Sequence, residues 1–168
     1  MRLIEGIATV GGERFADVGA FVAALGRIGD EHNVTVQAFD ARCVVSRRHL
    51  DRAVEIADRE RDRGDGIARD RAVEIALYAA GRRQIDRALE MGVSTGETPV
   101  VVLVDGPGDE RSAGEAVREL LAPATTLGEY DERRVREFYD IGGVELDATD
   151  ADLEALVLER VVLLVIDR

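Results

Sequence analysis

The fold class is decided by the run Thr98-Pro99-Val100-Val101-Val102-Leu103-Val104. Its β-branched and apolar residues are continuous from Val100 to Val104, and Asp105-Gly106-Pro107 follows. A short apolar run bounded by turn residues predicts a strand that is buried on both faces. Residues 3–10, which end at a Gly pair, and residues 34–39, which alternate, predict two further strands.

Helices are predicted between and after these strands, because apolar residues recur there at helical spacing. They cover residues 15–25, 46–57, 72–80, 85–91, 112–121, 131–139 and a last segment from 149. Ser46, Asp131 and Thr149 are suited to cap three of them. Residues 161–166 either continue the last helix or form a strand.

The strands do not alternate regularly with single helices, which disfavours a doubly wound fold. The pattern predicts an α+β fold in which a small mixed sheet packs against several helices as a two-layer sandwich. A length of 168 residues predicts a single domain over residues 1–168.

The net charge of the chain and its distribution limit the classes of function that the sequence suits. The 22 basic residues are all arginine, and 34 acidic residues bring the formal charge to −12. Such acidity argues against broad, non-specific nucleic-acid binding and suits a salty cytoplasm. Residues 42–87 differ, since their 12 Arg and 9 acids give +3. A net-basic segment inside an acidic chain indicates where an anionic partner would bind.

Several classes are excluded by what the sequence lacks. One Cys forms no internal disulfide, and no Cys/His cluster has zinc spacing. The longest apolar run, Val161 to Ile166, is far below the ~20 residues that span a bilayer. No secretion signal is recognisable at the N-terminus. We therefore expect a soluble cytoplasmic protein without a membrane association.

The sequence gives little support for a catalytic site. Cys43 and His49 lack a third, orienting group. The turn Gly106-Pro107-Gly108 lacks the last Gly of a dinucleotide loop, and acids surround it. The acidic clusters at 105–110 and 147–152 are explained as first-turn residues of helices. We expect no enzyme, no metal and no cofactor.

The segment Ala79-Ala80-Gly81-Arg82-Arg83-Gln84-Ile85 breaks one helix and opens another. Arg82 and Arg83 can fork onto phosphate or stack on a base, Gln84 can bond a base edge, and Ile85 can pack on one. Such residues suit an unpaired RNA end, whose bases are accessible. The alternative is a tight helix–helix corner with a solvated arginine pair.

The same residues carry a family resemblance. Leu77 to Ile85, followed by Ala88 and Gly92, resembles the central motif of the archaeal Cgi family. The stretches from Val36 to Ala41, around His49-Leu50 and Ala53, and from Leu158 to Val161 are also similar. Ala80 replaces the serine that is usual in the family. With its acidic, lysine-free composition, the chain resembles a haloarchaeal member.

The resemblance implies a non-catalytic subunit of the KEOPS complex, which installs threonylcarbamoyladenosine in tRNA. Such a subunit binds the small-lobe side of the atypical kinase/ATPase subunit, contacts the other KEOPS subunits indirectly, and recruits tRNA by its single-stranded CCA end. Four matching positions are implied as tRNA contacts: Gly81, Arg83, Gln84 and Ile85. Arg82 is added for its charge, and Arg47, Arg48 and His49 are weaker candidates at a neighbouring helix start.

Two other functions compete with this one. One is a small nucleotide-binding α/β enzyme that uses the Gly106–Gly108 turn with Cys43 and His49. The other is a purely structural, protein-binding adaptor, which a buried Gly81–Ile85 corner would favour. The apolar segment from Leu156 to Ile166 forms either a partner surface or part of the core.

Overall fold

The computed structural model describes residues 1–148 and 152–166. Its tertiary contacts divide the chain into two compact units. The first combines Met1–Ala41 with Gly92–Leu127, and the second combines Arg42–Met91 with Gly128–Arg168. The expectation of one domain over residues 1–168 stays a prediction.

The first unit is built on an antiparallel sheet of β1 (Arg2–Val10), β2 (Thr35–Asp40) and β3 (Gly96–Asp105), all three at predicted positions. The strand order is β1-β3-β2, and both pairings are antiparallel. The expectation of a mixed sheet is therefore wrong. A parallel pair of β1 and β2 does not form, because β3 lies between these two strands.

The central strand β3 confirms the sequence prediction, since Val100 to Val104 are all buried. It also contains Pro99, which has no N–H to donate to a neighbouring strand. The ladder with β2 covers only Val100 to Asp105, so Pro99 lies beyond it. There the strand has only β1 as its partner, with Pro99 opposite Ile7.

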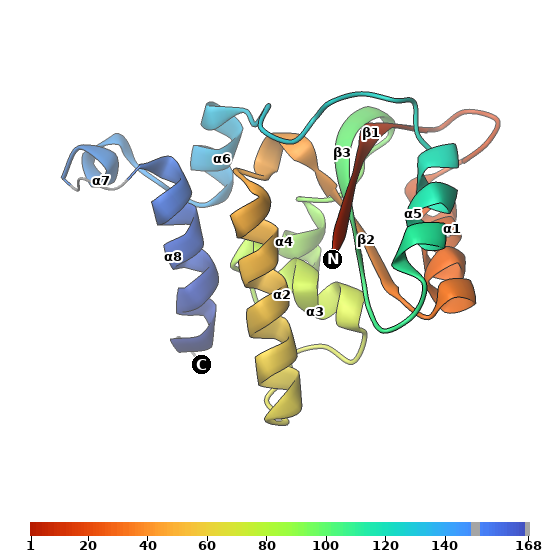
Figure 1. The fold of residues 1–168 in the computed structure, drawn as a ribbon. Coiled ribbons are helices and arrows are strands. Elements are labelled where there is room, and N and C mark those ends of the chain that lie inside the picture. Colours follow the sequence, from red (N-terminus) through yellow and green to blue (C-terminus); the bar gives the residue numbers. More distant parts are fainter. Residues whose placement is uncertain (149–151, 167–168) are drawn as a thin grey trace. The chain divides into compact units, whose positions relative to one another are not determined.

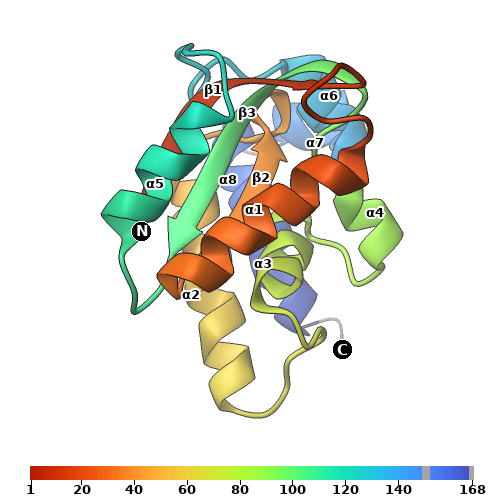
Figure 2. The same cartoon turned by 90° about the vertical axis from the view of Figure 1, so that its right-hand side faces the viewer.

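Two helices cover one face of this sheet: α1 (Val18–His32) and α5 (Glu110–Glu119) (Figure 2). Their apolar sides form one buried cluster with alternate strand residues: Ile4, Ala8, Phe21, Leu25, Ile28, Val36, Ala38, Val100, Val102, Val104, Ala113 and Val117. Asp17 caps the start of α1, and Asn33 ends it in the left-handed conformation. The predicted α+β class, with helices packed on a small sheet, is confirmed.

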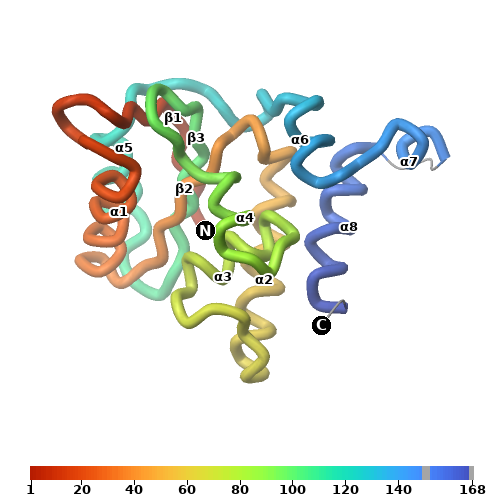
Figure 3. The backbone as a smooth tube through the Cα atoms, turned by 180° about the vertical axis from the view of Figure 1, so that it is seen from behind, coloured from red at the N-terminus to blue at the C-terminus, as the bar shows by residue number. Residues whose placement is uncertain are grey.

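The second unit is helical in the part of the chain that is described (Figures 1 and 3). After the 3-10 turn at Ala41–Cys43 it contains α2 (Arg47–Asp62), α3 (Arg71–Ala80), α4 (Ile85–Leu89), α6 (Glu132–Phe138), α7 (Gly143–Ala148) and α8 (Leu153–Ile166). Ser46 caps α2 and Asp131 caps α6, as predicted. Thr149, the predicted cap of the last helix, lies outside the described residues. The short α7 is not among the predicted helices.

The beginning of α3 is fixed by polar contacts. The guanidinium of Arg71 forks onto the Asp58 carboxylate of α2, at 2.8 and 2.7 Å. The buried Glu74 carboxylate accepts the backbone N–H groups of Ile67 and Ala68. Because charge-assisted bonds of this kind are strong and directional, they hold the beginning of α3 against α2.

The last helix, α8, packs against α2 and α3. One stripe of it is buried: Leu153, Leu156, Val157, Val161 and Leu164. Residues 161–166 therefore continue the helix, and this stripe belongs to the core. None of the described helices is both long and apolar enough to cross a membrane.

Candidate nucleic-acid interface

The corner between α3 and α4 is shaped by Gly81. This residue has φ 62° and ψ 33°, the left-handed conformation that closes many helices. The N–H of Arg82 donates to the Leu77 carbonyl and that of Gly81 to the Tyr78 carbonyl, both at 3.1 Å. A Cβ on Gly81 would lie 3.3 Å from the carbonyl oxygen of Arg160 in α8. The backbone of the corner is thus fixed on both sides.

Three side chains of the corner face solvent: Arg83, Gln84 and Ile85. Gln84 stands at the cap position of α4, yet its side chain makes no capping bond. Within the described residues, the side chains of Arg83 and Gln84 form no hydrogen bond or ion pair with the protein. Ile85 is 50% exposed. A guanidinium, an amide and an apolar side chain are therefore available to a ligand.

The comparison of the sequence with known protein families gives a match that covers this region. A family model described as kinase binding protein CGI-121 matches residues 19–164, which include the whole corner together with α2, α3 and α8 up to Leu164. The chain belongs to the CGI-121 family. Its members are kinase-binding proteins, so this chain has the role of a kinase-binding subunit. No curated protein matches the sequence.

One exposed residue of this CGI-121 member was missed from the sequence. Leu89 follows Ile85 by one helical turn and is 57% exposed, although its spacing suggested a buried face. Only Ala88 and Met91 of that predicted face are buried, because α4 ends after five residues. Ile85 and Leu89 therefore form an apolar strip beside Gln84, since residues four apart on a helix are neighbours. The expectation of a helix over residues 85–91 is wrong at its end, because α4 stops at Leu89.

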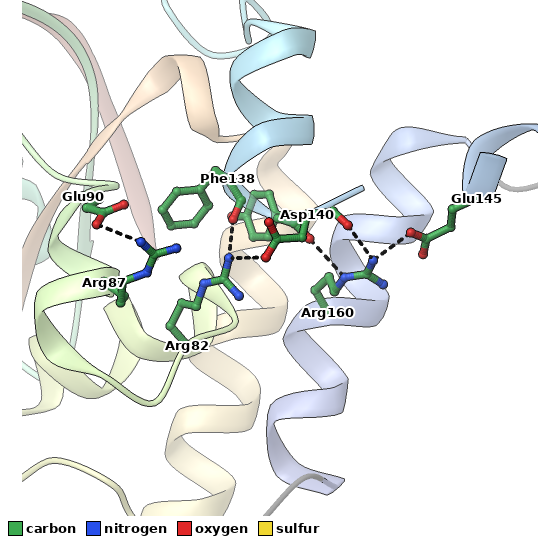
Figure 4. Close-up of polar contacts among 8 residues, drawn as sticks. Arg82, Arg87, Glu90, Phe138, Asp140, Glu145 and Arg160 are labelled. Atoms are coloured by element: carbon green, nitrogen blue, oxygen red, sulfur yellow. Dashed lines mark hydrogen bonds and ion pairs between the residues drawn. The ribbon is translucent and has the colours of Figure 1, made fainter. Parts of the chain in front are cut away.

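Unlike Arg83, the Arg82 side chain is held by contacts with other residues of the protein. Its Nη2 donates to the Phe138 carbonyl and lies 3.2 Å from the Asp140 carboxylate (Figure 4). Its guanidinium carbon lies 5.6 Å from the centre of the Phe138 ring. The side chain is 22% exposed. Arg82 thus ties the corner to the end of α6, and its charge is largely engaged within the protein.

The backbone that leads into the corner is held from inside by His49. This residue is completely buried, and its Nδ1 accepts the N–H of Val45 at 3.4 Å. The proton is therefore assigned to Nε2, which donates to the Ala79 carbonyl at 2.8 Å. The Tyr139 hydroxyl donates to the same carbonyl at 2.8 Å. His49 consequently supports the corner without facing a ligand.

Burial decides the protonation state of His49. Loss of solvation lowers its pKa to about 4, against the weaker raising effects of the Ala79 carbonyl and the Glu154 carboxylate. The imidazole is therefore neutral near pH 7. A neutral, buried ring gives no cation to an RNA phosphate.

The two arginines at the start of α2 carry partners of opposite charge. Arg47 lies 3.6 Å from Asp51, and Arg48 lies 3.6 Å from Glu154 of α8. Both side chains are more than half exposed, so these pairs are weak and are open to exchange with another anion. They remain candidate contacts of lower rank than Arg83.

Ala80, at the position where the family resemblance implies a serine, is buried. A side chain at this position points into the protein rather than toward a ligand at the corner. The replacement therefore removes no exposed donor from the interface of this CGI-121 member.

The residues of the competing enzyme hypothesis do not offer a site. Cys43 and His49 are both buried. At the Gly106–Gly108 turn, a Cβ on Gly108 would lie 1.9 Å from the His32 carbonyl, so protein backbone fills that space. The Gly106 N–H, which a phosphate would need, already donates to Glu110 at 3.3 Å. The Asp109 carboxylate caps α5 by accepting the N–H of Ser112 at 3.0 Å, and Glu110 is the acid in the first turn of that helix.

Replacing Gly81 with alanine is expected to lower the free energy of unfolding by about 1–2 kcal/mol, because an ordinary residue is strained in the left-handed conformation. Contact with Arg160 adds to this cost. Gly26 is the matched control: it lies inside α1, and a Cβ there meets nothing within 4 Å. Gly26→Ala is expected to raise stability by about 0.5–1 kcal/mol. Denaturant unfolding measures both, and equal effects of the two substitutions would contradict the assignment.

Proposed function

We propose that this kinase-binding protein is a non-catalytic subunit of the KEOPS complex. It binds the kinase/ATPase subunit and recruits tRNA through the single-stranded CCA end, in support of threonylcarbamoyladenosine modification. Membership of the CGI-121 family supports the kinase partner. Recruitment of tRNA is inferred from the corner after α3.

The observation that carries the proposal is the exposure of Arg83, Gln84 and Ile85 on a corner whose backbone is fixed. Arg83 offers a planar fork of donors to a phosphate. Gln84 offers both a donor and an acceptor to a base edge. Ile85 offers an apolar surface to a base plane. An unpaired RNA end presents a phosphate, a base edge and a base plane together, whereas a duplex keeps its base planes stacked and its Watson–Crick edges paired.

The charge pattern fits local recognition. The chain carries −12 overall, so its surface does not attract RNA at long range. In molar salt the Debye length is only about 3 Å, and contacts made at short range dominate. A forked arginine and packed bases work at that range. Recognition of one RNA end is therefore compatible with an acidic protein.

The exposure of the corner can also be compared with what the alternative functions require. A purely structural adaptor would be favoured by a corner packed in the core, but Arg83, Gln84 and Ile85 are exposed. The nucleotide-binding enzyme requires an open Gly106–Gly108 turn, which protein backbone occupies. Kinase binding is common to the adaptor and to the proposed subunit, so binding of tRNA is the property that separates these two functions.

The experiment compares tRNA with an intact CCA end and the same tRNA trimmed of these three nucleotides. The affinity of the purified protein for each is measured by anisotropy at one fixed salt concentration, because nucleic-acid affinity depends on salt. We expect trimming to weaken binding by tenfold or more, since each stacked base contributes about 1–3 kcal/mol. Equal affinity for the two RNAs would refute recruitment by the CCA end.

A further inference from the structure

Most aromatic side chains of the protein are inside it. The sequence has four Phe, three Tyr and no Trp. Five of these seven residues are buried: Phe15, Phe21, Phe39, Tyr78 and Tyr139. Tyr130 is 36% exposed and Phe138 is half-buried. Solvent therefore reaches only two aromatic rings, and one of them lies against the candidate interface.

Phe138 is held at the corner by Arg82. The guanidinium of Arg82 bonds the backbone carbonyl of Phe138, and its carbon lies 5.6 Å from the ring centre. Figure 4 shows the ring pointing from the end of α6 toward Arg82 of the corner and Arg87 of α4. The Tyr139 ring packs against the Phe138 ring edge to face, with ring centres 4.9 Å apart. Two contacts thus orient the Phe138 ring, one with the Arg82 guanidinium and one with the Tyr139 ring, and the hydrogen bond from Arg82 holds the Phe138 backbone.

The Asp140 carboxylate keeps Arg82 in place, at 3.2 Å from its Nη2. Arg160 of α8 holds the same segment, because its Nε donates to the Tyr139 carbonyl at 3.2 Å and its Nη2 bonds Glu145 at 2.9 Å. These contacts fix the α6 end relative to the corner. A ring and a guanidinium in a fixed geometry lose little entropy when a planar ligand stacks on them.

We propose that the Arg82–Phe138 pair is a stacking platform for one unpaired base of the RNA end bound at the corner. This inference rests on the proposed function, and it adds a residue 53 positions after Ile85 to the interface. Proteins that bind single strands combine arginine with aromatic rings, because every base has a π-face. Arg82 acts here as a positioning residue for the ring and as the cationic side of the platform.

Because the chain contains no tryptophan, the fluorescence of an introduced tryptophan reports on that one position. Phe138→Trp introduces a single indole at the platform, and Tyr130→Trp introduces one at the other accessible aromatic position. Stacking of a base quenches indole fluorescence. We expect a CCA-ended tRNA to quench Phe138→Trp and not Tyr130→Trp, and trimmed tRNA to quench neither. Absence of quenching in Phe138→Trp while that variant still binds intact tRNA would overturn the proposal.

An affinity series gives a second, independent test. Phe138→Leu keeps an apolar side chain but removes the ring, so we expect it to weaken binding of intact tRNA by about fivefold or more, where fivefold is the low end for one lost stack. Phe138→Tyr keeps the ring and is expected to bind as the unmodified protein does. A purely structural role would lower the melting temperature of Phe138→Leu and leave its affinity unchanged, which would overturn the proposal.

Different results would contradict the proposed function and the stacking platform. If the unmodified protein binds intact and trimmed tRNA equally, the proposed function is wrong. If it prefers the intact end but Phe138→Leu keeps full affinity, only the platform is wrong. A half-buried aromatic beside arginine is also typical of protein interfaces. Quenching of Phe138→Trp by the kinase partner and not by tRNA would assign the ring to that interface and overturn the platform.

Discussion

Lowering the pH from 7 to 4 is expected to reduce the free energy of unfolding by up to about 3 kcal/mol through His49 alone. In the folded protein the pKa of His49 is about 4, because the ring is buried, whereas the ordinary value is 6.5. Between these values the unfolded chain binds a proton and the folded chain does not. Stability from this group is therefore complete above pH 6.5 and is lost as the pH falls toward 4.

The matched variant is His49→Gln, whose amide keeps a donor for the Ala79 carbonyl but does not titrate over this range. Carboxylates titrate in both proteins, so their effects cancel in the difference between the two unfolding free energies. That difference should change steadily from pH 6.5 to 4 and then level off. A difference that is flat over this interval would show that the His49 ring is not desolvated.

Reversing the charge at Arg83 is the substitution expected to affect RNA binding most. The guanidinium has no protein partner among the described residues, so its loss should leave the fold intact. A hydrogen bond to a charged group contributes about 1.5–3 kcal/mol, and a carboxylate in its place also repels phosphate. We expect Arg83→Glu to weaken binding of intact tRNA by tenfold to a hundredfold or more.

Its control is Arg118→Glu, an exposed arginine of α5 in the first unit that the proposed interface does not include. Both substitutions change the net charge equally, so a general electrostatic effect would weaken both variants to the same extent. Binding of the kinase partner by Arg83→Glu tests whether the loss is specific to RNA. Equal losses of tRNA affinity in the two variants would remove Arg83 from the interface.

Local patterns in the sequence predicted much of the fold. The β-branched run from Val100 to Val104 identifies the central strand, and Ser46 and Asp131 cap helices as their side chains allow. The pairing of strands was not predictable in this way, because the insertion of β3 between β1 and β2 depends on contacts far apart in the chain. The end of the last helix was likewise left open, since an apolar β-branched run suits both a strand and a buried helix.

The candidate site shows the same limit. Arg83, Gln84 and Ile85 were identified from a short motif, and all three are exposed. The situation of His49 depends on Tyr139, 90 residues away, and that of Arg82 on Asp140, 58 residues away. Contacts between residues so far apart in the chain leave no pattern in a short stretch of sequence. Residue type alone made both side chains candidate RNA contacts; burial keeps His49 away from a ligand, whereas contacts with Phe138 and Asp140 fix how the partly exposed Arg82 is presented.

The central claim, that this corner binds the CCA end, is tested most directly by a thermodynamic cycle. Affinities are measured for the unmodified protein and Arg83→Glu, each with intact and with trimmed tRNA, at one salt concentration. If the corner contacts the end, Arg83→Glu weakens binding of intact tRNA by at least tenfold, and the two proteins bind trimmed tRNA equally. If the substitution weakens binding of both RNAs by the same factor, Arg83 and the CCA end do not meet, and the account is contradicted.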